Sequence, residues 1–220
     1  MRKIVVHMML SLDGCFEGPD HDLSWHRVDE ELHAHFNEQL ATASAFVEGR
    51  VTYELMEAFW PTADQDPDLP PVMHEFAGIW RAVPKIVYSR TLREVGPNAS
   101  LRAEVDPGEI RALKQQPGGD MTLGGVDLVE TFRRLDLVDE YRLYVNPVVV
   151  GRGRRLFETA DEPTDLELVE NRRFGNGVVL LRYAVRRPQD LAPASSGQEQ
   201  EPGRGEDGRE LRPVPAAGSD

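Results

Sequence analysis

Residues 45–53 read Ala-Phe-Val-Glu-Gly-Arg-Val-Thr-Tyr, and this stretch decides the fold class. Its first four residues, three of them apolar, predict a short strand. Gly49 ends this strand, and the segment from Arg50 to Trp60 predicts a helix that Pro61 terminates. A strand that passes through a glycine turn directly into a helix is typical of a parallel α/β sheet.

The same alternation extends to both sides of this stretch. Further strands are expected at Lys3–Leu10, Lys85–Ser89, Ser100–Val105 and Met121–Leu123, and further helices at Asp29–Ala43, Val72–Arg81, Pro107–Gln115 and Val126–Leu135. The last third is rich in strands, which are expected at Glu140–Val150, Leu166–Phe174 and Val178–Arg187. An Asn-Gly pair joins the last two as a hairpin. The pattern therefore predicts a mixed, mostly parallel sheet with helices on both faces and a C-terminal antiparallel β region.

Composition indicates one folded domain followed by a tail. The chain has 220 residues, 40% of them hydrophobic, which is enough for one full core. From Pro188 to Asp220 the chain consists largely of Pro, Gly, Ser and charged residues and has no aromatic side chain. Such a segment buries too little apolar area to offset the entropy of ordering. We expect a domain at 1–187 and a disordered acidic tail at 188–220.

Charge and cysteine content exclude several classes of protein. The net charge of −13 disfavours binding to nucleic acid and to anionic membrane surfaces. No apolar run reaches 18 residues, so no membrane-spanning helix is expected, and the N-terminal run lacks a signal-peptide cleavage site. The single cysteine, Cys15, excludes an internal disulfide and a multi-cysteine zinc site. We expect a cytoplasmic protein whose partner is a small-molecule substrate.

The turns after the predicted strands carry phosphate-binding chemistry. Open parallel sheets bind ligands beyond the carboxyl ends of their strands. Gly49 and Gly124 precede helices, whose N-termini attract anions, while Arg50 and Arg90 add guanidinium groups. The segments that contain Gly49, Arg90 and Gly124 are interpreted as three strand-to-helix turns. Together they predict a polyphosphate ligand such as a dinucleotide. Each turn taken alone is also ordinary turn chemistry.

Five motifs carry a family resemblance. They are Ser-Leu-Asp-Gly at 11–14, Gly-Arg-x-Thr-Tyr at 49–53, Ser-Arg-Thr-Leu at 89–92, Gly-Gly-Val-Asp-Leu at 124–128, and the segment 139–157, which ends in Gly-Arg-Gly-Arg-Arg-Leu-Phe. In this order they resemble the dihydrofolate-reductase-like superfamily. Within it, the chain resembles the reductase domain of the riboflavin-biosynthesis deaminase-reductase and its stand-alone bacterial relatives. The likeness covers 1–187 and implies a three-layer α/β fold and an NADPH-dependent reductase.

The resemblance implies a set of cofactor-binding residues. It assigns the cofactor phosphates to Gly49, Arg50 and Thr52, the adenosine 2′-phosphate to Ser89 and Arg90, and the pyrophosphate to Gly124, Gly125 and Val126. Guanidinium groups near a 2′-phosphate favour NADPH over NADH by charge pairing. The complete riboflavin enzyme also carries a zinc deaminase domain, which one cysteine cannot build. The resemblance therefore implies 5-amino-6-(5-phosphoribosylamino)uracil reductase-like activity alone, and it leaves the pathway role and the substrate open.

Hydride transfer also needs a proton donor. Asp13, after the first strand, is the first candidate, and Glu30, at the start of the first helix, is the second. Each has a structural alternative, since Asp13 is suited to order its own turn and Glu30 to complement the helix dipole. Trp25 is expected either to contact the substrate or to anchor its loop. His33 and His35 point to different helix faces, so no metal site is expected.

Two other functions stay open at this stage. A dihydrofolate reductase is disfavoured by the Ser-Leu-Asp-Gly turn and by the Gly-Arg-Gly-Arg-Arg-Leu-Phe segment. A nucleotide-binding or scaffold protein with the same fold but no turnover would keep the phosphate turns. The resemblance also implies a homodimer formed through the C-terminal β region.

Overall fold

The computed structural model describes residues 1–157 and 163–187. The chain divides into two units, Met1–Arg187 and Pro188–Asp220. Every helix and strand described below belongs to the first unit. The acidic tail expected at 188–220 lies outside the described residues.

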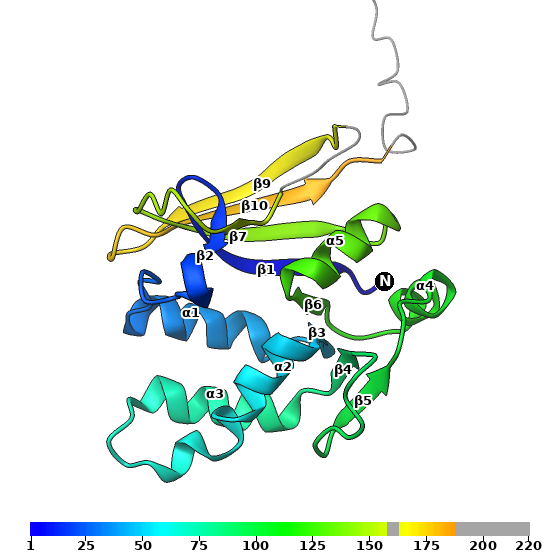
Figure 1. Cartoon of the computed structure of the whole chain (residues 1–220), viewed down its shortest axis with the longest axis horizontal. Helices are drawn as coiled ribbons and strands as arrows, with labels where there is room; N and C mark the ends of the chain where they lie inside the picture. The colour runs from blue at the N-terminus through cyan, green and yellow to red at the C-terminus, as the bar shows by residue number, and fades with distance from the viewer. Residues whose placement is uncertain (158–162, 188–220) are drawn as a thin grey trace, which may run out of the picture. The chain divides into compact units, whose positions relative to one another are not determined.

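An eight-stranded sheet of order β5-β4-β3-β6-β1-β7-β10-β9 organises the described part of the chain (Figure 1). The strands are β1 Ile4–Ser11, β3 Ala45–Gly49, β4 Lys85–Tyr88, β5 Ala99–Arg102, β6 Met121–Gly124, β7 Glu140–Asn146, β9 Leu166–Arg173 and β10 Val179–Val185. Neighbours from β5 to β7 pair in parallel, whereas β10 runs antiparallel to β7 and to β9. The predicted mixed, mostly parallel sheet with an antiparallel C-terminal region is confirmed.

Helices cover both faces of this sheet, as predicted. They are α1 Glu30–Leu40, α2 Arg50–Glu57, α3 Pro71–Ala82, α4 Pro107–Gln115 and α5 Val126–Arg134. On one face, Ile110 of α4 and Phe132 of α5 pack with Val6 and Leu123 of the sheet. On the other face, α3 packs on β3 and β4, and α1 packs on β7 and β10. Burial of these apolar side chains stabilises the three layers.

The largest differences from the predicted elements lie where prolines or very short strands occur. Helix α2 ends at Glu57, and a 3₁₀ helix at Trp60–Gln65 continues the chain through Pro61. Strand β7 ends at Asn146, because the next residue is a proline, which has no N–H to donate to a sheet. Strands β2, Cys15–Glu17, and β8, Arg154–Arg155, form a separate two-stranded sheet. Segments this short show no hydrophobic periodicity, so they were not predicted.

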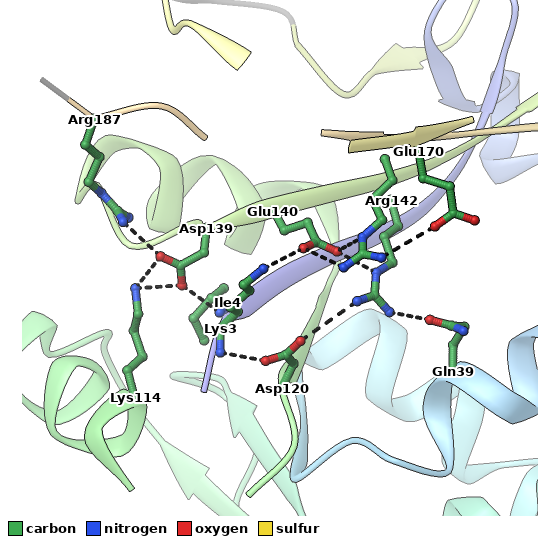
Figure 2. Close-up of polar contacts among 11 residues, drawn as sticks. Lys3, Ile4, Gln39, Lys114, Asp120, Asp139, Glu140, Arg142, Glu170 and Arg187 are labelled. Carbon is green, nitrogen blue, oxygen red and sulfur yellow. Dashed lines mark hydrogen bonds and ion pairs between the residues drawn. The ribbon is translucent and has the colours of Figure 1, made fainter. Parts of the chain in front are cut away.

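A buried carboxylate joins the strands near the amino-terminal end of β7 (Figure 2). Glu140 is fully buried and lies 3.0 Å from Nζ of Lys3, 2.8 Å from Nε of Arg142 and 2.6 Å from Nε of Arg182. Burial would raise the pKa of Glu140, but hydrogen bonds from these cations outweigh it and lower the pKa to about 2. The charged network therefore ties β1, β7 and β10 together at the end of the sheet away from the predicted ligand turns.

Candidate functional site

A cleft of about 1070 Å³ lies at the carboxyl ends of the parallel strands. Its lining contains every residue predicted to bind the cofactor, namely Gly49, Arg50, Thr52, Ser89, Arg90, Gly124, Gly125 and Val126. These residues come together because β3 lies between β4 and β6 in the sheet. Turns that are far apart in the sequence thus become neighbours at the carboxyl ends of the strands, as the parallel topology predicts.

The N-termini of two helices, α2 and α5, border this cleft, and neither has a capping side chain. Gly49 precedes α2 and Gly125 precedes α5, and neither N-cap offers a side chain that accepts a hydrogen bond. In contrast, Asp29 caps α1 and Asp106 caps α4. The first N–H groups of α2 and α5 are therefore left for a ligand, and the positive ends of both helix dipoles favour an anion.

The two glycine turns touch each other through Thr52. Gly125 has φ of +90°, and a Cβ atom placed on it would lie 3.1 Å from Oγ1 of Thr52 and 3.6 Å from the Gly49 nitrogen. Gly124 pairs with Glu48 in the sheet, next to Gly49. A side chain at Gly125 would fill this space, so the backbone forms a cradle that a phosphate group can approach closely.

The turn after β4 has a different form from the one predicted. Ser89 and Arg90 lead through a loop to β5 rather than into a helix, so the expectation of three strand-to-helix turns is wrong for this one. Ser89 Oγ accepts hydrogen bonds from the backbone of Thr91 at 3.1 Å and of Leu92 at 3.0 Å. The hydroxyl group thus shapes the turn, and it leaves the exposed Arg90 on the cleft wall.

The half of the cleft beyond the phosphate turns includes the loop 14–26 that was expected to border the substrate, but none of its lining residues was predicted individually. It is lined mainly by β1, β2 and the loop that follows β2, through His7, Met8, Met9, Phe16, Glu17, His21, Leu23 and His26. Apolar and imidazole side chains dominate this half, which suits an uncharged ring better than a phosphate. His7 lies inside an apolar strand and therefore reads as a core residue, so no pattern in the sequence marked it.

Three lining residues carry buried polar atoms without a hydrogen-bond partner among the described residues. They are Nδ1 of His7, Nε2 of His26 and Oη of Tyr88. Burial, helped by the nearby Arg142 charge, lowers the pKa of His7 to about 3. Burial also lowers the pKa of His26. Both imidazoles are therefore neutral near pH 7. Because buried polar atoms are normally paired, each of these atoms is a candidate for a hydrogen bond to a ligand or to water in the cleft.

Asp13 does not line the cleft. Its carboxylate accepts hydrogen bonds from Ser11 Oγ at 2.8 Å, from the Val150 nitrogen at 3.0 Å and from the Gly151 nitrogen at 2.8 Å. The hydrogen bond from Ser11, followed by those from Val150 and Gly151, lowers the pKa of Asp13 to about 2. The side chain therefore orders the turn after β1, and its role as a proton donor stays a prediction that this geometry does not support.

Glu30 and Trp25 also lie outside the cleft lining. Glu30 is exposed in the first turn of α1, next to the Asp29 cap. Trp25 donates its Nε1 hydrogen to the Asp22 carbonyl at 3.1 Å. Its ring lies edge-on to the His26 ring, with 4.3 Å between the two ring centroids. Trp25 thus supports a lining residue, and its contact with substrate stays a prediction.

In 1–157 and 163–187, no three His, Cys, Asp or Glu side chains group as ligands of a metal ion. Within the same ranges, every helix is too short or too polar to cross a membrane.

The amino-acid sequence matches a known protein family. The RibD C-terminal domain family matches residues 2–180. The chain belongs to this family. YyaP of Bacillus subtilis (strain 168) is 33% identical over 186 residues, which cover 83% of this chain and 94% of YyaP. YwjB of the same organism is 28% identical over 183 residues, or 81% of this chain and 96% of YwjB.

Solved structures share the fold of this RibD C-terminal domain protein. A protein from Shewanella sp. PV-4 named for riboflavin biosynthesis aligns with a TM-score of 0.64 at 21% identity, over 85% of this chain and 100% of that one. The diaminohydroxyphosphoribosylaminopyrimidine deaminase and 5-amino-6-(5-phosphoribosylamino)uracil reductase of Thermotoga maritima aligns with a TM-score of 0.57 at 16% identity, over 84% of this chain and 57% of that one. The family match and these neighbours together show a RibD C-terminal domain with the fold of these solved structures.

Proposed function

We propose that this protein is an NADPH-dependent reductase that transfers hydride to a small heterocyclic substrate, in the manner of a 5-amino-6-(5-phosphoribosylamino)uracil reductase. The observation that carries the proposal is the convergence of three phosphate-binding turns in one cleft. Two uncapped helix N-termini, the cradle at Gly125, and the Arg50 and Arg90 guanidinium groups all line it. This combination suits a dinucleotide, which presents several phosphates along one edge of a sheet.

The residues of the cleft fit the parts of NADPH in a definite order. The N–H groups at the start of α2 and α5 suit the pyrophosphate, with Thr52 between them. Arg90 follows β4, the strand next to β3, and suits the 2′-phosphate that NADH lacks. The bound cofactor supplies the hydride. The half lined by His7, Phe16 and His26 then holds the ring that accepts it, in surroundings that are largely apolar.

The proton for the reduction is best sought among side chains that line the cleft. Glu17, His21 and His26 line it and can carry a proton, and Glu17 lies 2.9 Å from Nδ1 of His21. Asp13 and Glu30, the donors expected from sequence, lie outside the lining. We therefore favour the Glu17–His21 pair as the source of the proton, because the lowered pKa of His26 leaves that imidazole neutral near pH 7.

The proposal also covers assembly and location. Strand β9 forms one edge of the sheet and carries exposed apolar side chains. Leu168 and Val169 are each 50% exposed and Leu166 is 38% exposed. An exposed apolar edge strand is covered in many proteins by a second chain. We propose a cytoplasmic homodimer in which two copies meet at β9.

A thermal-shift titration with NADPH and NADH tests the cofactor assignment. A ligand present at about 100 times its dissociation constant adds roughly 2.7 kcal/mol of stability. NADPH is expected to raise the melting temperature at a lower concentration than NADH. Arg90→Ala should remove this difference, whereas Arg93→Ala, an exposed residue of the same loop outside the cleft, should keep it. Equal responses of the wild-type protein to both dinucleotides would contradict the 2′-phosphate assignment.

A further inference from the structure

Arg154 lines the cleft from an element that none of the phosphate turns includes. It belongs to β8, which pairs with β2 so that Arg154 lies opposite Glu17. Gly153 permits this approach, because a Cβ atom on it would lie only 2.1 Å from the Glu17 carbonyl oxygen. The guanidinium carbon lies 5.2 Å from the centroid of the Phe16 ring. The arginine is therefore positioned by the β2–β8 sheet and by an aromatic face.

The present partners of Arg154 are two carboxylates, each near a different nitrogen of the guanidinium group. Its Nη2 lies 2.6 Å from Oδ1 of Asp127, and its Nη1 lies 3.5 Å from Oε1 of Glu17. Asp127 is in the first turn of α5, directly after Gly125 and Val126. The Asp127 side chain is 88% exposed and that of Arg154 is 45% exposed. An ion pair this exposed contributes little net stability, so replacing Asp127 by another anion costs little.

We propose that Arg154 is a further cofactor-binding residue, which exchanges Asp127 for a pyrophosphate oxygen of the dinucleotide. The proposal rests on the proposed NADPH site. The α5 N-terminus, where the pyrophosphate is assigned, carries the same Asp127 that now holds the guanidinium group. Glu17 and Phe16 keep Arg154 over the cleft during the exchange. The arginine would then tie the β2–β8 sheet to the bound cofactor.

The position of Arg154 distinguishes its effect from that of Arg90. Arg90 follows β4, at the end of the cleft assigned to the 2′-phosphate, whereas Arg154 reaches the first turn of α5. The pyrophosphate is common to NADPH and NADH. Loss of Arg154 should therefore weaken both dinucleotides by the same factor, whereas loss of Arg90 should weaken NADPH alone.

Fluorescence titration of the full chain with NADPH and NADH tests this prediction. Arg154→Ala should raise both dissociation constants about tenfold, the effect of losing one charge-assisted hydrogen bond. Arg154→Lys, which keeps the charge but loses the planar fork, should fall between wild type and alanine. Arg152→Ala is the matched control, because Arg152 is exposed in the same segment and does not line the cleft. An Arg154→Ala protein that binds both dinucleotides within twofold of wild type would overturn the proposal.

A double-mutant cycle tests the exchange itself. Asp127→Asn releases Arg154 and should tighten NADPH binding about two- to fivefold, the worth of an exposed ion pair. In an Arg154→Ala background the same substitution should have no effect. Equal tightening in both backgrounds would mean that Asp127 repels the ligand directly, and the exchange would be wrong. A wild-type protein that binds neither dinucleotide would overturn both the proposed function and the role of Arg154. If wild type binds NADPH and the Arg154 variants bind it equally well, only the role of Arg154 is overturned.

Discussion

Gly125 and Thr52 approach each other so closely that a Cβ atom on the glycine would lie 3.1 Å from the threonine Oγ1. The contact brings the start of α5 against the first turn of α2, and it depends on a backbone φ of +90° that side chains rarely adopt. Both helix N-termini therefore face the same part of the cleft. Neither Gly125 nor Thr52 belongs to the apolar clusters on the sheet faces. Their close approach therefore shapes the phosphate cradle and does not form part of the core.

Gly125→Ala should weaken cofactor binding in addition to any cost to the fold. The new methyl group would push Thr52 away and strain the backbone, at a cost of roughly 1–3 kcal/mol for a non-glycine residue held at positive φ. We expect the NADPH dissociation constant to rise at least tenfold in a titration. Gly78→Ala is the control, because a Cβ there meets nothing within 4 Å inside α3. Unchanged NADPH affinity in Gly125→Ala would contradict the cradle.

Asp13→Asn should destabilise the turn after β1 without changing cofactor affinity. An amide keeps only one acceptor oxygen, so the hydrogen bonds from Val150 and Gly151 can no longer both form as they do now. The expected result is a lower melting temperature with an unchanged NADPH dissociation constant. Asp20→Asn, at an exposed position, should alter neither. Because the pKa of Asp13 is lowered to about 2, the carboxyl group is ionised from pH 4 upward and should add no step to a pH profile of activity there.

The phosphate half of the site could be predicted because its signals are local. A strand, a glycine and a helix follow one another at Gly49 and again at Gly125, and the parallel topology brings such turns to one edge. The turn at Ser89 and Arg90 offers a hydroxyl and a guanidinium group after a strand, but it has no glycine and leads through a loop to β5.

The other half of the site depends on pairing that the sequence does not show. Glu17 and Arg154 meet only through β2 and β8, which have three and two residues. Asp13 was expected to be a proton donor because it follows the first strand, yet its carboxylate is occupied by backbone groups from the segment after β7. Short strands and long-range caps of this kind leave no periodic pattern, so only the folded chain reveals them.

Leu168→Glu should convert the proposed dimer into a monomer. Leu168 is half exposed on the edge strand β9, and a charge at a covered apolar position is costly to bury. Light scattering coupled to size-exclusion chromatography should give twice the 24.7 kDa chain mass for wild type and the single chain mass for the variant. Val28→Glu, which charges another exposed apolar residue outside β9, should stay dimeric. A wild-type protein that elutes as a monomer at all concentrations would contradict the β9 interface.

Glu140→Gln should destabilise the folded protein in a pH-dependent way. The amide keeps the shape of Glu140 but leaves the buried Arg142 and the nearby Arg182 without their shared negative charge. Removing one partner from a buried ionic network costs about 3–5 kcal/mol, and we expect urea denaturation at pH 7 to show a loss of that order. Glu109→Gln, which breaks the partly exposed pair with Arg102, should cost less than about 1 kcal/mol.

The pH dependence follows from the lowered pKa of Glu140. Its pKa is about 2 in the folded protein against the ordinary 4.5, so the unfolded chain takes up the proton first. The stabilisation is therefore fully present above pH 4.5 and is lost as the pH falls toward 2. The difference in unfolding free energy between wild type and Glu140→Gln should shrink across this range, because the wild-type side chain becomes neutral as well. A difference that stays constant from pH 7 to pH 2.5 would show that the glutamine disturbs packing rather than charge.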